Sequence, residues 1–168
     1  MSWEDELQSL ARDRENECQS DISQMLLEHP GMLRKQLRHY LAEQTDRGLL
    51  KKTYENVPRL NTIAERLLEL VCDEVEFRSD SCLSFKIKLE QEQRGWLVKQ
   101  FKFDLLLAGR SINRISIHLN PGGGYDPLKV PRCHFHIGNG EAHIPFPIMN
   151  PRLMLHILCE HIESDTGL

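Results

Sequence analysis

The sequence predicts an α+β fold made of N-terminal helices, a four-stranded antiparallel meander and a C-terminal helix. Two observations predict it. Apolar residues recur with helical spacing through residues 3–73, and from residue 83 they alternate with polar residues, as in half-buried strands. Helices that are separated from strands along the chain are typical of the α+β class. We therefore expect an N-terminal helical region over residues 1–74 and an α+β meander domain over residues 75–168.

The helical region is predicted to hold three helices. An amphipathic apolar stripe predicts the first over residues 3–28, and a second is expected over residues 32–47. A third is predicted over residues 62–73, because Thr62 and Glu65 have the spacing of a capping box. We expect the first helix to pack on its own domain or to dock a partner or a second copy.

The meander is predicted from the alternation of apolar and polar residues with period two. The alternation slips near Lys99 and Gln100, which predicts a bend or a bulge there. The closing helix is expected to begin at Pro151 with Asn150 as its N-cap. The four strands are expected near residues 83–90, 96–107, 113–119 and 132–137.

Composition limits the classes of protein to which the chain can belong. Its 168 residues are enough for one domain, and a net charge of −4 argues mildly against a dedicated nucleic-acid binder. No apolar run reaches the ~20 residues that span a bilayer, and the N-terminus lacks a signal peptide pattern. The five cysteines form no CxxC pair, which is typical of reduced core thiols. We expect a cytoplasmic protein with no membrane partner.

Histidines gather in the segment from residue 112 to residue 144. His134 and His136 are two positions apart on a predicted strand, so they share one face. His118 lies on the polar face of the preceding strand, and His143 follows a glycine turn that can fold it back. If the two strands are neighbours, the imidazoles line one polar face.

Such a cluster has three possible functions besides a purely structural one. Neutral imidazoles bind transition metals such as zinc. One imidazole can act as a general acid or base, as nuclease-like chemistry needs. A protonated set can hold a phosphate, with help from Arg114, Lys129 and Arg132. The residues do not decide among these, and no metal or other cofactor is assigned.

The stretch ISIHLNPGGGYDPLKVPRCHF resembles the third strand, proline shoulder and fourth strand of ubiquitin-conjugating enzymes and their inactive relatives. HFHIGNGEAHI is similar to that family's His-Pro-Asn turn and the approach to its catalytic cysteine. The resemblance places His134 on the family's histidine, His136 on its asparagine and His143 on or near its nucleophile. Because no cysteine stands there, the resemblance implies the scaffold without thioester chemistry.

PRCHFHIG and the segment MNPRLMLHILCEHI are similar to the TumE-like proteins of prokaryotic toxin–antitoxin and defence loci. This second resemblance implies a biological setting more than a mechanism. It also describes a sheet that ends in a proline and a His-x-His pair, followed by a short helix.

Two hypotheses of different kinds follow from the sequence. The first is an accessory or interaction protein of a prokaryotic defence or toxin–antitoxin system, with a protein partner bound through the helix at 3–28. The alternative is a histidine-dependent nuclease or transferase, or a metal-binding protein, that uses the four histidines. Whether the chain is an enzyme, binds nucleic acid or forms a homo-oligomer is left open. The candidate residues are His118, His134, His136 and His143.

Overall fold

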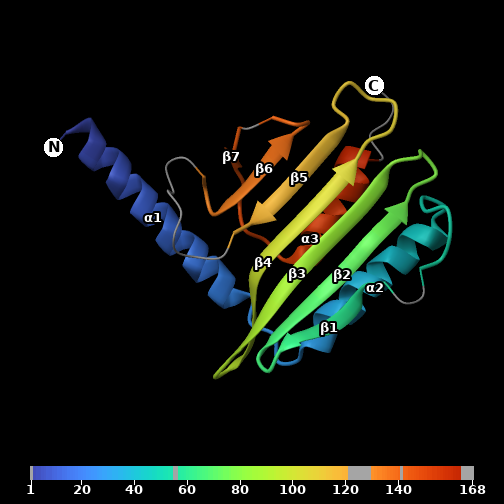
Figure 1. The fold of residues 1–168 in the computed structure, drawn as a ribbon, viewed down its shortest axis with the longest axis horizontal. Coiled ribbons are helices and arrows are strands. Elements are labelled where there is room, and N and C mark those ends of the chain that lie inside the picture. Colours follow the sequence, from blue (N-terminus) through green and yellow to red (C-terminus); the bar gives the residue numbers. More distant parts are fainter. Residues whose placement is uncertain (1, 55–56, 121–129, 141, 164–168) are drawn as a thin grey trace.

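A single antiparallel sheet dominates the structure, a computed structural model that describes all residues except 1, 55–56, 121–129, 141 and 164–168. Within the described residues its strands follow one another in the order of the sequence, so the sheet is one continuous meander (Figure 1). The strands are β1 (Arg59–Ala64), β2 (Leu67–Glu76), β3 (Cys82–Glu92), β4 (Gly95–Leu106), β5 (Arg114–Leu119), β6 (Cys133–Ile137) and β7 (Ile144–Pro145).

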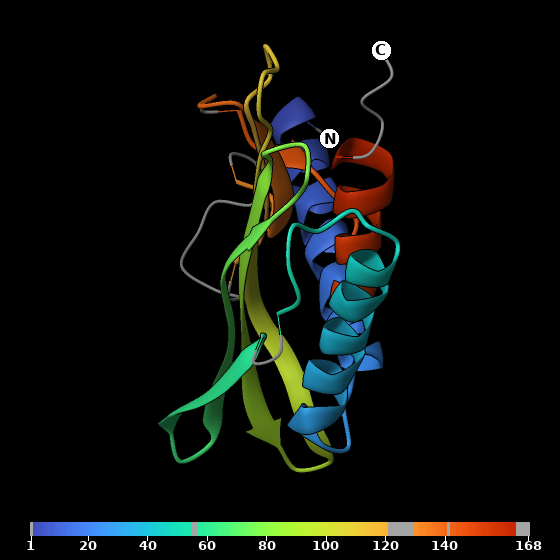
Figure 2. The same ribbon diagram turned by 90° about the vertical axis from the view of Figure 1, so that its right-hand side faces the viewer.

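The described helices lie on one side of this sheet, as the edge-on view shows (Figure 2). They are α1 (Trp3–Gln24), α2 (Pro30–Asp46) and α3 (Pro151–His156), which continues as a π-helix, η1 (Ile157–Glu163). The core forms between the helices and the covered face. Apolar side chains of α2, α3 and η1 are buried there with the inward residues of β2 to β6. The other face of the sheet is polar.

The predicted α+β class is confirmed, but four strands undercount the sheet, because the described residues form seven. The third predicted helix is wrong. Residues 59–64 and 67–76 are instead the paired strands β1 and β2, and β2 runs through position 74. Thr62 pairs with Leu68 across this hairpin and caps no helix. Ile63, expected in a helical core, is 48% exposed.

The helical misreading of β2 has a physical cause. Its pairing with β3 shifts register between Cys72 and Val75, so the strand contains an irregularity there. Leu70 and Cys72 face the core before the shift, and Val75 and Phe77 face it afterwards. The buried positions therefore do not keep a strict period of two. A bulged strand of this kind yields an apolar spacing close to that of a helix.

The first helix ends at Gln24, four residues earlier than predicted. The chain then pairs with the hairpin between β3 and β4: Leu27 and Trp96 exchange backbone hydrogen bonds of 2.8 and 2.7 Å. Gly95 permits this contact, because it has φ +148° and a Cβ there would lie 2.4 Å from the Leu27 carbonyl oxygen. The linker between the two helices is thereby fastened to the sheet.

The bulge predicted near Lys99 is confirmed. Lys88 pairs with Gln100 and Leu89 pairs with Val98, so Lys99 is the extra residue on β4. Its ammonium group lies 2.8 Å from the carboxylate of Glu92. The bulge lets the strand bury Val98 on one side of the irregularity and Phe101, three positions later, on the other.

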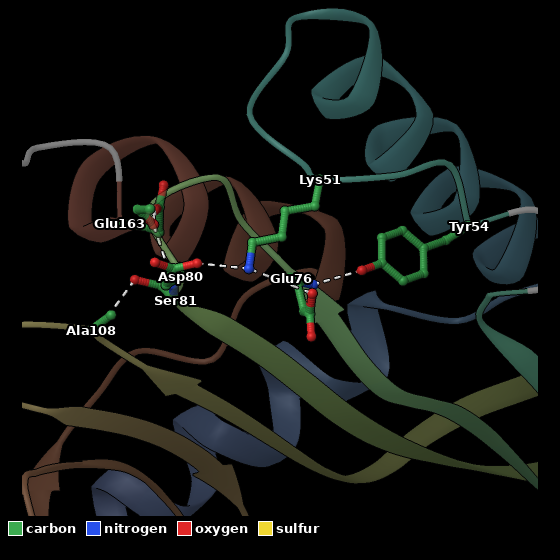
Figure 3. Close-up of polar contacts among 8 residues, drawn as sticks. Lys51, Tyr54, Glu76, Asp80, Ser81, Ala108 and Glu163 are labelled. Carbon is green, nitrogen blue, oxygen red and sulfur yellow. Dashed lines mark hydrogen bonds and ion pairs between the residues drawn. The ribbon is translucent and has the colours of Figure 1, made fainter.

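The closing helix begins as predicted, with Asn150 accepting a hydrogen bond from the Arg152 amide at 2.8 Å. At the end of this helix, Glu163 is buried and accepts a hydrogen bond from the Ser79 hydroxyl. Other polar contacts near the β2–β3 turn are drawn in Figure 3, including Lys51 at 2.7 Å from Asp80. They connect this turn to the segment after α2 and to the C-terminal helix.

Candidate metal centre

Three histidines meet on the polar face of the sheet where β5 and β6 run side by side. His118 is the direct cross-strand partner of His134, and His136 stands opposite Ser116. Because strand residues alternate between faces, these three imidazoles lie on the side opposite the core residues Ile117 and Cys133. The predicted adjacency of the two strands is confirmed, and with it the shared face of the three side chains.

The imidazoles are close enough to share one small ligand. The ring centroids of His118, His134 and His136 lie 4.9 to 5.3 Å apart. One ring nitrogen from each lies within 4.8 Å of the others. In a tetrahedral zinc site the ligand nitrogens are ~3.4 Å apart, because Zn–N bonds are about 2.0–2.1 Å. The nitrogen–nitrogen distances therefore need to shorten by little more than an ångström, which rotation of the side chains can provide.

His143 completes a group of four. Its ring centroid lies 4.8 Å from that of His134 and 4.6 Å from that of His136. Gly138, with φ +63°, begins the turn after β6, and β7 then pairs back on β6 through Ile144 and Phe135. This return brings His143 over the face that already carries the other imidazoles.

His134 is held by a backbone contact. Its Nδ1 lies 2.7 Å from the carbonyl oxygen of Pro131, and the residue is only 1% exposed. A carbonyl oxygen can only accept, so Nδ1 carries the proton and donates it. In the neutral ring, Nε2 then has its lone pair available to bind a metal. A second hydrogen bond of this kind is the usual way in which proteins orient a metal-binding histidine.

His118 contributes a buried ring nitrogen, Nε2, that has no hydrogen-bond partner among the described residues. Burial lowers the pKa of His118 to about 4, and the neighbouring His134 and His136 add to the effect. Burial also lowers the pKa of His134 and of His136. The three rings are therefore neutral at pH 7, which is the form that binds metals.

Of the three cations predicted to help the histidines bind an anion, the structure describes Arg114 and Arg132, and their surroundings differ from one another. Arg114 donates hydrogen bonds of 2.7 and 3.2 Å to the Asp104 carboxylate. Arg132 is buried, and its Nε donates to the Asn120 carbonyl oxygen at 3.2 Å. Lys129 lies outside the described residues, as does Tyr125 of the proline shoulder. The anion-binding role of the three cations stays a prediction.

The sequence reasoning missed other charged residues beside the histidines. Asp104 on β4 receives Arg114, the hydroxyl of Ser116 and the ammonium group of Lys102 at 3.1 Å. Burial raises the pKa of Asp104, but these three hydrogen-bond donors outweigh it and lower the pKa overall. Lys102 is itself the cross-strand partner of His118. The alternation of β4 places Lys102 and Asp104 on the polar face. Only the register of β4 against β5 shows which histidine they approach.

Cys133, Cys72 and Cys159, whose side chains the structure describes, do not contribute a nucleophile to this site. Cys133, next to His134 in sequence, faces the core, and its thiol lies 3.7 Å from the Pro147 carbonyl oxygen. Burial raises the pKa of Cys72 to about 12 and also raises that of Cys159. These thiols stay protonated at neutral pH, which makes them poor nucleophiles.

A larger cavity, of about 1030 Å³, lies between α2 and α3, remote from the imidazoles in sequence and in fold. It is lined by charged residues that are already paired within it, such as Arg47 with Glu160. Its aromatic member, Tyr40, lies edge-on to His156 and beneath Arg152. Because its two arginines are already paired with Glu160 and Glu43, the imidazole cluster offers the clearer chemistry.

Of the described helices, none combines the length and the apolar character needed to cross a membrane. Comparisons of the chain with protein-family models, with curated proteins and with solved structures found no match.

Proposed function

We propose that this protein binds a divalent transition metal ion through His118, His134 and His136, with His143 as the fourth ligand. One observation carries the proposal: a ring nitrogen from each of the first three lies within 4.8 Å of the others. Imidazole suits zinc, copper, iron and nickel, and zinc takes four such ligands in tetrahedral geometry. The buried Nε2 of His118, which accepts no hydrogen bond from the described residues, further supports a role as a metal ligand.

The lowered pKa values favour a metal over the other uses of the cluster. A protonated set that holds phosphate by itself would need charged imidazoles at neutral pH. Here burial and mutual repulsion keep His118, His134 and His136 neutral. A general acid with a pKa near 4 would be almost fully deprotonated at pH 7. A bound metal ion is instead stabilised by coordination to the ring nitrogens of three neutral imidazoles.

An enzymatic version of the proposal requires that one metal ligand be replaceable. His143 is the candidate, because it lies on the connection between β6 and β7, whereas the other three are strand residues. Catalytic zinc sites commonly keep three protein ligands and one exchangeable position for water. The nuclease or transferase hypothesis thus becomes a metal-dependent one, in which a bound water replaces His143.

Metal analysis of the purified protein tests the proposal. After exposure to zinc and removal of unbound metal, the wild type is expected to retain about one equivalent per chain. The variant with His118, His134 and His136 all changed to alanine is expected to retain none. A variant with His156→Ala and His161→Ala is a matched control, because this second pair of neighbouring rings lies on the closing helix.

Two results would overturn the metal proposal. One is a wild type that retains less than about a tenth of an equivalent of zinc, cobalt or nickel. The other is equal retention in the wild type and in the triple variant, provided that circular dichroism shows both to be folded.

The hypothesis of a defence-type interaction protein on a conjugating-enzyme-like sheet stays a prediction, as does a protein partner on the first helix. The feature that supports such a partner is the exposure of apolar side chains on α1, where Trp3 is 70% and Leu10 63% exposed. Metal binding and partner binding are compatible, because α1 lies on the helix-covered side of the sheet (Figure 2), whereas the imidazoles lie on the opposite face from the core residues Ile117 and Cys133.

A further inference from the structure

The register of the sheet aligns two lysines with two of the histidines. Lys86 on β3 pairs with Lys102 on β4, Lys102 pairs with His118 on β5, and His118 pairs with His134 on β6. All four are polar-face positions, since their sequence neighbours Phe85, Phe103, Ile117 and Cys133 belong to the core. The four side chains form a lysine–histidine row that runs straight across four strands.

The two lysines at the end of this row are unfavourable neighbours for one another. Like charges directly opposite on an antiparallel pair destabilise a sheet. Lys86 has no ion-pair partner among the described residues, and it is exposed. Lys102 is ion-paired with Asp104, and it shares this carboxylate with Arg114. The arrangement is one that a bound anion would stabilise.

The charge balance around the row favours an anion. Asp104 carries one negative charge against the positive charges of Lys102 and Arg114, which leaves one positive charge, and Lys86 adds a second. Two acids of β2, Asp73 and Glu74, lie beside these residues. Asp73 is engaged by Arg59, and Glu74 reduces the balance to one net positive charge. Lys102 is the direct cross-strand partner of His118, so the positive end of the row adjoins the imidazole cluster.

Space for a ligand is present beside the lysines. A cavity of about 260 Å³ is lined by Ser84, Lys86 and Lys102 together with two acids, Asp104 and the Arg59-paired Asp73. The hydroxyl of Ser84, the cross-strand partner of Asp104, adds a neutral hydrogen-bond donor. Two ammonium groups and a hydroxyl suit an anion with several oxygens better than a single halide.

We propose that Lys86 and Lys102 form a binding subsite for the phosphate group of a phosphate monoester whose other end reaches the metal centre. The inference rests on the proposed function and names the substrate class of that site. An anionic phosphate fits the net positive charge of the lysine end of the row. The metal centre, two strands further along, then contacts a different part of the same small molecule.

Inorganic phosphate is the probe that tests the subsite. Calorimetric titration of the full chain at pH 7 and low salt is expected to show one saturable phosphate site. Lys86→Gln keeps most of the side chain but removes the charge, and it is expected to weaken phosphate binding about tenfold, as does Lys102→Gln. Lys35→Gln on α2, on the opposite side of the sheet, is the matched control and is expected to bind phosphate like the wild type.

The outcomes separate this inference from the metal proposal. Phosphate binding that depends on Lys86, in a protein that retains no metal, supports the subsite and overturns the metal centre. Retained metal together with no saturable phosphate binding overturns the subsite alone. Two further results also overturn the subsite. If Lys35→Gln weakens phosphate binding as much as Lys86→Gln does, the effect is one of net charge and not of the row. If Lys86→Gln leaves phosphate binding unchanged, Lys86 does not contact the phosphate.

Discussion

Replacing His118 by leucine should reduce the acid sensitivity of the metal-free protein. Burial and the neighbouring imidazoles lower the pKa of His118 from 6.5 to about 4. At pH 5 the folded chain therefore leaves this ring neutral, whereas the unfolded chain protonates it. The unfolded state binds the additional proton, so the free energy of unfolding falls as the pH falls. By linkage this one group removes at most about 2 kcal/mol between pH 7 and pH 5.

Urea unfolding at the two pH values, followed by circular dichroism with a chelator present, measures the effect. The leucine variant is expected to lose about 2 kcal/mol less than the wild type over this interval. At pH 7 it is expected to be more stable by up to about 1 kcal/mol, because no buried ring nitrogen is left without a partner. His39→Leu, at an exposed position on α2, controls for the loss of an imidazole in itself.

The reasoning is refuted if the His118 variant and the wild type lose equal stability between pH 7 and pH 5. It is also refuted if the control variant gains as much acid resistance as the His118 variant. Either result would mean that burial on the polar face does not keep the His118 ring neutral.

Three further predictions concern stability and are measured by urea unfolding. Asp104→Asn is expected to cost about 1–3 kcal/mol at pH 7, because two cations lose their carboxylate, and the difference from wild type shrinks as the pH falls through the lowered pKa of Asp104. Deleting Lys99 is expected to cost less than about 1 kcal/mol, because Val98 and Phe101 then stand two positions apart and share the buried face of a regular strand, and a larger loss contradicts the bulge. Changing Trp3 and Leu10 together to serine is expected to alter stability by less than about 0.5 kcal/mol, whereas Ile22→Ala costs about 2–4 kcal/mol; equal effects would mean that the start of α1 is buried.

The histidine cluster was predictable because two rules decide it. The period of two places His134 and His136 on one face, and strands that follow one another along the chain are usually neighbours in a sheet. His118 then falls on the same face through the polar phase of its own strand. The position of His143 depended on the turn at Gly138, for which the sequence offers the glycines as a signal.

The first hairpin of the sheet was not predictable in the same way. β1 and β2 are joined at Glu65 and Arg66, a turn without the glycine, proline or asparagine that usually marks a hairpin. The register shift between Cys72 and Val75 removes the strict alternation that would have identified β2. The lysine–histidine row was hidden for a related reason, because its alignment depends on the register of β3 against β4.

The extra residue at Lys99 divides the β3–β4 hairpin into two parts with different contacts. The outer part, with Gly95 and Trp96, is held by Leu27 in the linker before α2. The inner part positions Lys102 against its neighbours on either side. Insertions or deletions at the hairpin tip are thus taken up before they reach the inner part, and the tip can change in length while the alignment of charged and imidazole groups further along stays the same.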